Sequence, residues 1–246
     1  MRVTRVYLDA ALEASSLVEI PRTAGEHLVK VLRARVGDAF VLFSGDGREY
    51  AATIAQIRGT RVTAAIGAAR TVDRESPLAV TLYQCVARGD RMDFIVQKAT
   101  ELGVARIVPV LSERSVVRLD GDKARAKAGH WQAVAVSACE QCGRNRVPRI
   151  DAPRPLLTIL GELAPGGARL MLDAEADVAS SAALPALDAG VEIAIGPEGG
   201  FTPQEREAFA LCRFSGVRLG PRILRTETAA IVALAWLQSR FGDLGR

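Results

Sequence analysis

The sequence contains no apolar run long enough to cross a membrane. A membrane-spanning helix needs roughly 18–20 consecutive apolar residues, and no segment of this chain reaches that length. Residues 1–9 carry Arg2 and Arg5 but lack the apolar core of a signal peptide. We therefore expect a cytoplasmic protein that has no membrane partner.

Metal ligands are scarce as well, with four cysteines and two histidines in 246 residues. Cys139 and Cys142 form a CxxC pair, but a structural zinc site needs a second ligand pair, which neither His27 nor His130 completes. The glycine spacing of a dinucleotide fingerprint and the Gly-Lys-Ser/Thr of a Walker A loop are also missing. We expect free thiols, no metal, and neither classical dinucleotide nor nucleoside-triphosphate binding.

Positive charge is concentrated in the first two thirds of the chain, whose net charge is +4. Lys and Arg outnumber Asp and Glu by 10 to 7 in residues 1–72 and by 12 to 7 in residues 82–150, whereas residues 151–246 carry 9 against 12. Clustered Arg and Lys attract phosphate, so this pattern fits an RNA-facing surface. It also fits an ordinary solvated surface.

Residues 1–72 read as a β-rich domain. Strand composition covers residues 3–8, 39–43, 49–57 and 60–66, and one short helix is expected over 24–32. Such strands fit a small closed barrel. The polar stretch 71–77 ends in proline and is the expected linker, so we place the domain boundary between residues 72 and 73.

Residues 73–246 alternate between strand and helix patterns. Apolar runs predict strands at 78–86, 105–111, 168–172, 191–195 and 216–219, and helical spacing covers 90–102, 129–142 and 226–241. This alternation predicts a mostly parallel sheet of the α/β class. Ligands bind at the carboxyl ends of such strands, so we expect chemistry in the loops after residues 172, 195 and 219.

A glycine-rich loop follows the strand at 191–195. Gly196, Gly199 and Gly200 let the backbone approach a ligand closely. A capping box then starts a helix, with Thr202 as the N-cap and Glu205 at the third helical position. A tight strand-to-helix turn would explain the same residues.

The loop after residue 219 contains two apolar residues, Ile223 and Leu224. They need a burial partner, which is either the protein core or a flat ligand such as adenine. We expect Thr226 to be the N-cap of the last helix, and Arg225 and Glu227 place charge where a ligand should sit. A capped helix with a salt bridge would also account for these residues.

Three further motifs accompany the two loops: QKATELGV at 97–104, SERS at 112–115 and EQCGR at 140–144. In this order the five motifs resemble the bacterial 16S ribosomal RNA uridine-N3 methyltransferase family of the SPOUT superfamily. With HLVKVLR at 27–33, followed by Gly37 and Asp38, the resemblance covers almost the whole chain. Cys142 and Asn145 depart from the family pattern, which has a small polar residue and often a hydroxyl residue at these positions.

The resemblance implies a PUA-like RNA-binding β-barrel, residues 1–72, followed by a SPOUT α/β domain with a C-terminal trefoil knot, residues 73–246. It implies S-adenosylmethionine as the cofactor and a homodimer with the active site near the subunit interface. The substrate would be one uridine of 16S rRNA, either free or in the assembled small ribosomal subunit. Three loops would form the cofactor pocket, with Leu172, Asp173, Gly196, Pro197, Glu198, Gly199, Gly200, Leu219, Gly220, Ile223 and Leu224.

Catalysis at N3 of uridine requires loss of its proton or stabilisation of the resulting anion. Arg225 is the candidate to stabilise the anion at O2 or O4, and Glu198 or Glu227 would accept the proton or orient Arg225. The RNA-binding candidates carry charge or can stack on a base: Arg2, Arg5, Arg22, His27, Lys30, Arg33, Arg88, Arg114, Arg144 and Arg146. Simpler interpretations are a packed His27 and a structural ion pair between Arg114 and Glu113.

Three other functions stay open. The first is a SPOUT methyltransferase that acts on tRNA or on another rRNA position, which the first domain argues against. The second is a non-catalytic RNA-binding scaffold, which the intact loops at 196–200 and 219–227 argue against. The third is a nucleotide-dependent enzyme with an unusual phosphate loop, in which the basic first domain would have no purpose.

Overall fold

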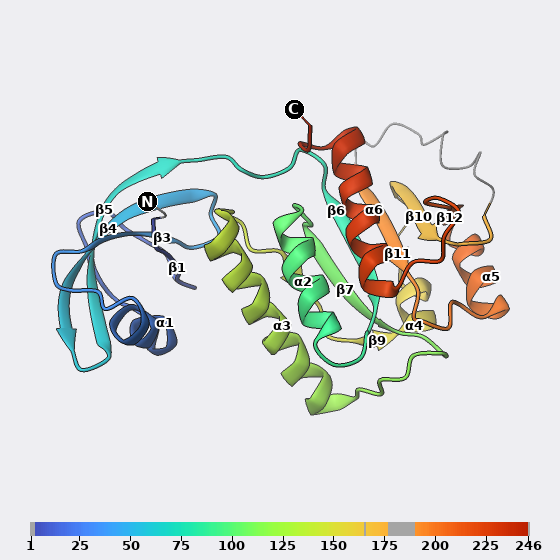
Figure 1. Ribbon diagram of the computed structural model, residues 1–246, viewed down its shortest axis with the longest axis horizontal. Helices are drawn as coiled ribbons and strands as arrows, with labels where there is room; N and C mark the ends of the chain where they lie inside the picture. Colours follow the sequence, from blue (N-terminus) through green and yellow to red (C-terminus); the bar gives the residue numbers. More distant parts are fainter. Residues whose placement is uncertain (1–2, 165, 177–189, 246) are drawn as a thin grey trace. The chain divides into compact units, whose positions relative to one another are not determined.

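The computed structural model describes residues 3–164, 166–176 and 190–245, which form two compact units (Figure 1). The first unit contains the described residues up to Glu75 together with Cys139–Val147, and the second contains Ser76–Ala138 and the described residues from Pro148 onward. Helix α3 (Gly121–Cys142) therefore contributes residues to both units. The boundary between residues 72 and 73 stays a prediction.

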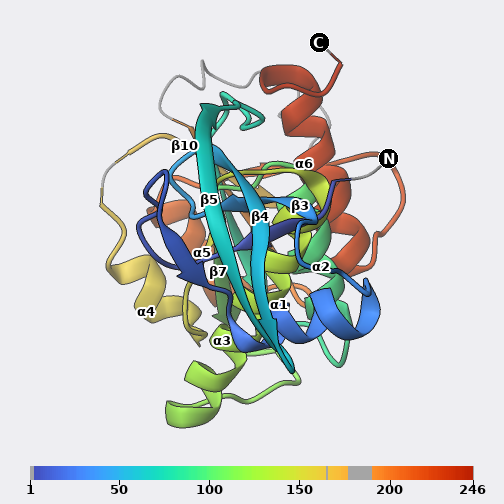
Figure 2. The same ribbon diagram turned by 90° about the vertical axis from the view of Figure 1, so that its left-hand side faces the viewer.

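The first unit is built on a five-stranded sheet, whose long hairpin of β4 and β5 is seen in Figure 2. The strand order is β1 (Arg5–Tyr7), β3 (Ala39–Phe43), β4 (Arg48–Arg58), β5 (Arg61–Thr71) and β2 (Leu17–Glu19). β1 pairs with β3 in parallel, and all other neighbours in this sheet are antiparallel. Helix α1 (Arg22–Glu26) continues directly into the π-helical turn η1 (His27–Val31).

The alternation of side chains along the strands explains which residues form the core of the first unit. Successive side chains of a strand point to opposite faces, and Leu42, Ile54 and Val62 are all buried in one cluster. The sequence pattern predicted four of the five strands. It missed β2, whose three residues Leu-Val-Glu lie in a segment without a longer strand pattern.

Hydrogen bonds and ion pairs tie residues 139–147 to the first unit. The Glu75 carboxylate accepts hydrogen bonds from the Arg144 guanidinium at 2.7 and 2.9 Å and from the backbone N–H groups of Asn145 and Arg146 at 3.2 and 3.0 Å. Arg5 donates to the carbonyl oxygen of Arg144 at 3.1 Å and to the side chain of Asn145 at 2.6 Å. These long-range contacts explain why this compact unit is not one continuous stretch of sequence.

The second unit contains a parallel sheet, as the alternating pattern predicted. Its strand order is β12 (Ser215–Val217), β10 (Ala168–Leu172), β11 (Val191–Ile195), β6 (Val80–Cys85), β7 (Arg106–Leu111) and β8 (Arg149–Ile150), and β9 (Arg154–Pro155) also pairs with β7. Every pairing in this sheet is parallel. The α/β class is confirmed, and the trefoil knot stays a prediction.

Helices cover both faces of this sheet (Figure 1). Tyr83 and Cys85 of β6 lie in a buried cluster with side chains of α4 (Leu156–Gly161) and α5 (Pro203–Leu211). Gln84, between them in the strand, donates a hydrogen bond to Thr226 of α6 (Thr226–Phe241). Because neighbouring strand residues face opposite ways, α4 and α5 pack on one face and α6 on the other, where it contacts α2 (Arg91–Glu101).

Helix α3 begins at Gly121, whereas the apolar period predicted a start at residue 129. Residues 122–128 are rich in Ala, Lys and Arg, which favour helix without forming an apolar stripe. Periodicity therefore cannot reveal this part of the helix. No helix among the described residues is both long and apolar enough to span a bilayer.

Candidate functional site

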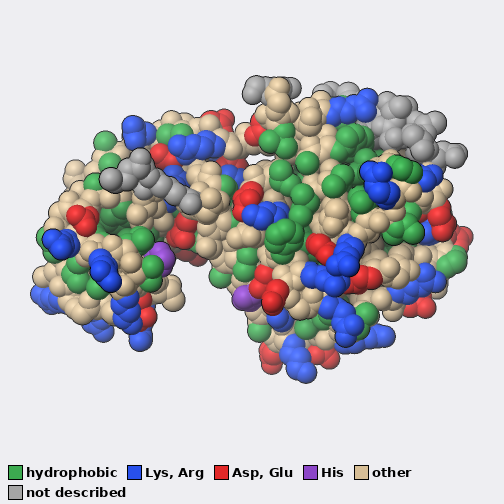
Figure 3. Space-filling view, in the orientation of Figure 1, with side chains coloured by type: hydrophobic (Ala, Val, Ile, Leu, Met, Phe, Trp, Pro, Cys, Tyr) green, Lys and Arg blue, Asp and Glu red, His purple; other side chains and the backbone are tan. Residues whose placement is uncertain are grey.

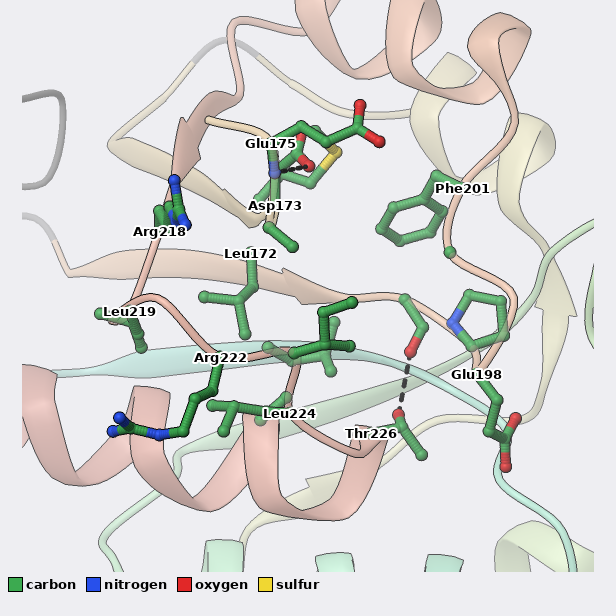
Figure 4. A pocket seen from close by; sticks show the side chains of 18 of the residues that line it. Leu172, Asp173, Glu175, Glu198, Phe201, Arg218, Leu219, Arg222, Leu224 and Thr226 are labelled. Carbon is green, nitrogen blue, oxygen red and sulfur yellow. Dashed lines mark hydrogen bonds between the residues drawn. The ribbon is translucent and has the colours of Figure 1, made fainter. Parts of the chain in front are cut away.

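Three loops at the carboxyl ends of β10, β11 and β12 line one cavity (Figure 4). All the predicted cofactor-binding residues line it except Gly199, and ten further residues that were not predicted line it as well. These are Met171, Ile195, Phe201, Arg206, Arg218, Arg222, Thr226 and Ala229, together with Ala174 and Glu175 beside the predicted Asp173. The three predicted loops thus come together, although 22 residues separate the first from the second in the sequence and 18 separate the second from the third.

Two conditions favour glycine in the loops of this cavity, a close approach of another side chain and a positive φ angle. A Cβ atom on Gly196 would lie 3.2 Å from the ring of Phe201, which is closer than side chains normally approach. Gly200 and Gly220 have φ angles of +66° and +81°, in the left-handed region that glycine adopts without strain. The apolar side chains of Leu172, Leu219 and Leu224 lie around the hollow between these loops (Figure 4).

Thr226 connects two of the loops. Its hydroxyl donates to the carbonyl oxygen of Gly196 at 2.9 Å and accepts from Nε2 of the fully buried Gln84 at 2.9 Å. The prediction that Thr226 is the N-cap was wrong, because Arg225 occupies the N-cap position of α6 and makes no side-chain cap. The Thr226 hydroxyl instead fixes the start of the glycine-rich loop.

The other end of the glycine-rich loop runs into helix α5, where the predicted capping box of Thr202 and Glu205 is confirmed. Glu205 is buried and accepts hydrogen bonds from the backbone N–H of Thr202 at 2.9 Å and of Glu113 at 2.8 Å. Arg114 donates to the carbonyl oxygen of Gly199 at 2.8 Å. Glu113 thus contacts the helix and Arg114 contacts the loop, and no ion pair forms between these two side chains.

Charged groups stand at the edge of the cavity beyond β10. The Arg206 guanidinium forms ion pairs with Asp173 at 2.7 Å and with Glu175 at 3.1 Å. This links the loop after β10 to helix α5, which follows the glycine-rich loop. Arg206 could not be recognised from a local pattern, because its partners lie more than 30 residues away.

The three predicted catalytic residues occupy different environments. The Glu198 side chain points away from the middle of the cavity (Figure 4) and pairs with Arg91 at 3.1 Å. Arg225 is exposed at the start of α6 and does not line the cavity. Glu227 has one buried carboxylate oxygen, Oε2, without a hydrogen-bond partner among the described residues. The catalytic roles stay predictions.

The predicted RNA-binding residues divide into buried and exposed groups. Arg5 and Arg144 are buried in ion pairs with Glu49 and Glu75, so their guanidinium groups are already engaged inside the first unit. Arg2 lies outside the described residues. The exposed candidates are Arg22, His27, Lys30, Arg33, Arg88, Arg114 and Arg146.

Four of the exposed candidates lie in or beside one segment of the first unit. Arg22 and Lys30 both pair with Glu26, at 3.1 and 3.4 Å, on α1 and η1. His27 is exposed, which argues against the alternative of a packed helix residue. Arg33 has a φ of +53°, an unusual conformation for a residue with a side chain. Basic side chains gather over the region of α1 in Figure 3.

The CxxC pair lies at the end of α3. Cys139 is buried and donates a hydrogen bond to the carbonyl oxygen of Arg146, and burial raises the pKa of its thiol to about 12. Among the described residues, no cluster of His, Cys, Asp and Glu side chains is arranged to hold a metal ion.

Family models match both parts of the chain. An RNA methyltransferase PUA domain matches residues 20–67, and an RNA methyltransferase domain matches residues 74–238. The second match covers the parallel sheet and all three loops of the cavity. The second unit, with its cavity, therefore has the sequence of an RNA methyltransferase domain.

Proteins of known family give the same result. The chain is 32% identical to the ribosomal RNA small subunit methyltransferase E of Buchnera aphidicola subsp. Schizaphis graminum, over 99% of this chain and 98% of that protein. The crystal structure of the Neisseria gonorrhoeae ribosomal RNA small subunit methyltransferase E bound to S-adenosyl methionine is 37% identical, with a TM-score of 0.91, and covers 99% of this chain and all of that one.

A methyltransferase from Legionella pneumophila in complex with bound cofactor SAM is also similar, with 38% identity and a TM-score of 0.92. The similarity extends over 99% of this chain and 100% of that chain. These matches confirm the family predicted from the five motifs. The chain, with its PUA-type first unit and its three-loop cavity, belongs to the ribosomal RNA small subunit methyltransferase E family of RNA methyltransferases.

Proposed function

We propose that this chain transfers a methyl group from S-adenosylmethionine to N3 of one uridine in 16S rRNA of the small ribosomal subunit. The observation that carries the proposal is the three-loop cavity, in a chain whose similar solved structures hold S-adenosylmethionine. A cytoplasmic location follows from a ribosomal substrate.

The cavity suits this cofactor. Apolar walls at Leu172, Leu219 and Leu224 fit a flat adenine ring, and the lack of a side chain at Gly196 and Gly220 lets a ligand approach the backbone closely. The charged rim at Asp173 and Arg206 suits the polar end of an amino acid. Gly199, whose carbonyl oxygen is engaged by Arg114, supports the loop from outside.

S-adenosylmethionine supplies a methyl group that its sulfonium already activates, so the protein chiefly has to position the acceptor. Uridine N3 is a poor nucleophile while it is protonated. Arg225, whose side chain is exposed beside the cavity residues Leu224 and Thr226, would stabilise the negative charge at O2 or O4. Either Glu198 or Glu227 would accept the proton or orient Arg225.

Of these two carboxylates, Glu227 is the better candidate for the proton. Its Oε2 has no hydrogen-bond partner among the described residues, so it can accept a proton without losing an existing contact. The Glu198 carboxylate is held by Arg91 and would first have to leave that pair. Glu227 also directly follows Thr226, whose hydroxyl contacts the glycine-rich loop.

RNA binding by the first unit would use its exposed basic segment. Arg22, His27, Lys30 and Arg33 present charge and stacking surface along α1, η1 and the residues that follow. We also propose a homodimer. The adjoining helices α2 and α6 each expose a large apolar side chain, Phe94 at 45% and Val232 at 38%, which a second copy would cover.

Methyl transfer from labelled S-adenosylmethionine to small ribosomal subunits that lack the modification tests the function. We expect N3-methyluridine at one position, identified by mass spectrometry of the digested rRNA. Label in tRNA or at another rRNA position would replace the substrate assignment but keep the reaction. Absence of both methyl transfer and cofactor binding by calorimetry would favour a non-catalytic RNA-binding scaffold.

A further inference from the structure

Glu198 lies between two hollows of the second unit. One is the three-loop cavity, and the other, which we call the outer pocket, is lined by Arg88, Gly89, Arg91, Val116 and Glu198. Among the described residues, Glu198 alone lines both. At Glu198 the glycine-rich loop therefore borders both the cavity and the outer pocket.

The outer pocket is basic. Arg88 and Arg91 precede and begin helix α2, and both are exposed. Arg114 approaches the same loop from a different segment and donates through Nη1 to Gly199, which leaves other N–H groups of its guanidinium available. Glu198 supplies the one negative charge among the described residues that line the pocket.

Both side chains of the ion pair between Arg91 and Glu198 are accessible to solvent. The side chains retain 44% and 34% of their accessible surface, and the guanidinium reaches one carboxylate oxygen at 3.1 Å. Exposed pairs of this kind contribute little free energy. Arg88 forms no ion pair with any described residue. An anion that binds both Arg88 and Arg91 more tightly would therefore displace the Glu198 carboxylate from Arg91.

We propose that the outer pocket is a docking site for a phosphodiester of the RNA substrate. Without RNA, the Glu198 carboxylate pairs with Arg91 at the position that this phosphate takes when RNA binds. The inference rests on the proposed function, because the phosphodiester would belong to RNA whose acceptor uridine reaches the cofactor in the cavity. Guanidinium groups match phosphate oxygens in geometry and charge. The Glu198 carboxylate is therefore released from its ion pair with Arg91 only when an RNA phosphate binds.

Two substitutions test the proposal, because they should change RNA affinity in opposite directions. Arg91→Ala removes a phosphate ligand and should weaken binding to unmodified small subunits roughly ten-fold. It should also reduce the slope of log K against log salt concentration by about one. Glu198→Gln removes the competing carboxylate and should tighten binding about two- to five-fold.

Matched controls separate this role from a structural one. Arg91→Lys keeps the charge and should keep the salt slope, and Arg125→Ala removes an exposed arginine of α3 that pairs only locally with Asp122. Cofactor affinity, measured by calorimetry, should not change in Arg91→Ala. If both Arg91→Ala and Glu198→Gln weaken cofactor binding and neither alters the salt slope, the pair only braces the loop and the proposal is wrong.

The remaining outcomes are also decisive. If Arg91→Ala changes the oligomeric state in light scattering instead of RNA affinity, the pocket contacts a second copy of the chain and the proposal is overturned. If the unaltered protein methylates its substrate while Arg91→Ala binds RNA normally, the docking site is wrong and the function stands. If the opposite-sign effects on affinity appear without any methyl transfer, the docking site stands and the proposed reaction fails.

Discussion

At the scale of single residues, Thr226 shows how one hydroxyl can organise a binding loop. It receives a hydrogen bond from buried Gln84 of β6 and passes one to the Gly196 carbonyl oxygen, so the sheet and the glycine-rich loop are joined through α6. The same residue had a different expected role, as a helix cap. Its neighbours in the sequence could not reveal that a strand 142 residues away supplies its donor.

Thr226→Val should therefore lower the free energy of unfolding by about 1–3 kcal/mol, because it keeps the shape but leaves buried polar partners unpaired. Cofactor affinity should fall with it, since the Gly196 carbonyl oxygen is no longer held. Thr226→Ser keeps the hydroxyl and serves as the control. Denaturant unfolding and calorimetry measure the two effects; equal stability in the Val and Ser variants would contradict this role.

Arg225→Ala should reduce turnover on the order of 100-fold and leave the Kd for the cofactor nearly unchanged. The reason is that Arg225 lies outside the cavity but next to its lining residues, where it can reach an acceptor base. Single-turnover methyl transfer and calorimetry supply the two numbers. A loss of the same size in turnover and in cofactor affinity would exclude the proposed role.

At the scale of elements, the start of helix α5 serves as a structural junction. The capping box of Thr202 and Glu205 was predictable from four consecutive residues, because its contacts are local. The second contact of Glu205, to the backbone of Glu113, joins the helix to the loop after β7 and depends on the fold. Glu205 thus holds two segments that border the glycine-rich loop.

Thr202→Ala should cost about 1 kcal/mol of stability, the usual value of an N-cap. Glu205→Ala should cost more, because it leaves the backbone N–H groups of both Thr202 and Glu113 without their acceptor. Glu207→Ala, an exposed change in the same helix, is the control. Urea titration gives the ranking, and equal costs for Thr202→Ala and Glu205→Ala would show that the contact to Glu113 contributes nothing.

At the scale of the whole molecule, the first unit is assembled from two separate stretches of sequence. Glu49 of β4 accepts hydrogen bonds from Arg5 and Arg74, and these arginines also contact residues 143–145. Burial raises the pKa of Glu49, but the hydrogen bonds from Arg74 and Arg5 outweigh it and hold the pKa below the ordinary value of 4.5. The carboxylate therefore supports this unit in its charged form.

Because the folded-state pKa of Glu49 is lowered, its contribution to stability is complete above the unfolded pKa and is lost as the pH falls through the folded value. Glu49→Gln should therefore destabilise the protein at neutral pH and flatten the decline in stability between about pH 5 and pH 3. Glu19→Gln, an exposed change in β2, is the control. An acid-side profile identical to that of the unaltered protein would contradict the assignment.

Much of the site was determined by the sequence alone. The strands at 168–172 and 191–195, the last helix at 226–241 and the capping box were predicted within the residues that form them, because each depends on short-range periodicity or capping. The rule that ligands bind at the carboxyl ends of parallel strands then indicated the three loops. The five motifs identified the family.

Only the tertiary structure decided which side chains meet. Arg91 lies 107 residues from Glu198, and Arg114 lies 85 residues from Gly199, so no local pattern could pair them. Arg5 and Arg144 look like RNA ligands in the sequence but are buried in ion pairs, because charge alone does not specify exposure. Short-range patterns set the elements and their ends, whereas the packing of the elements determines which charges are partnered and which are available for RNA.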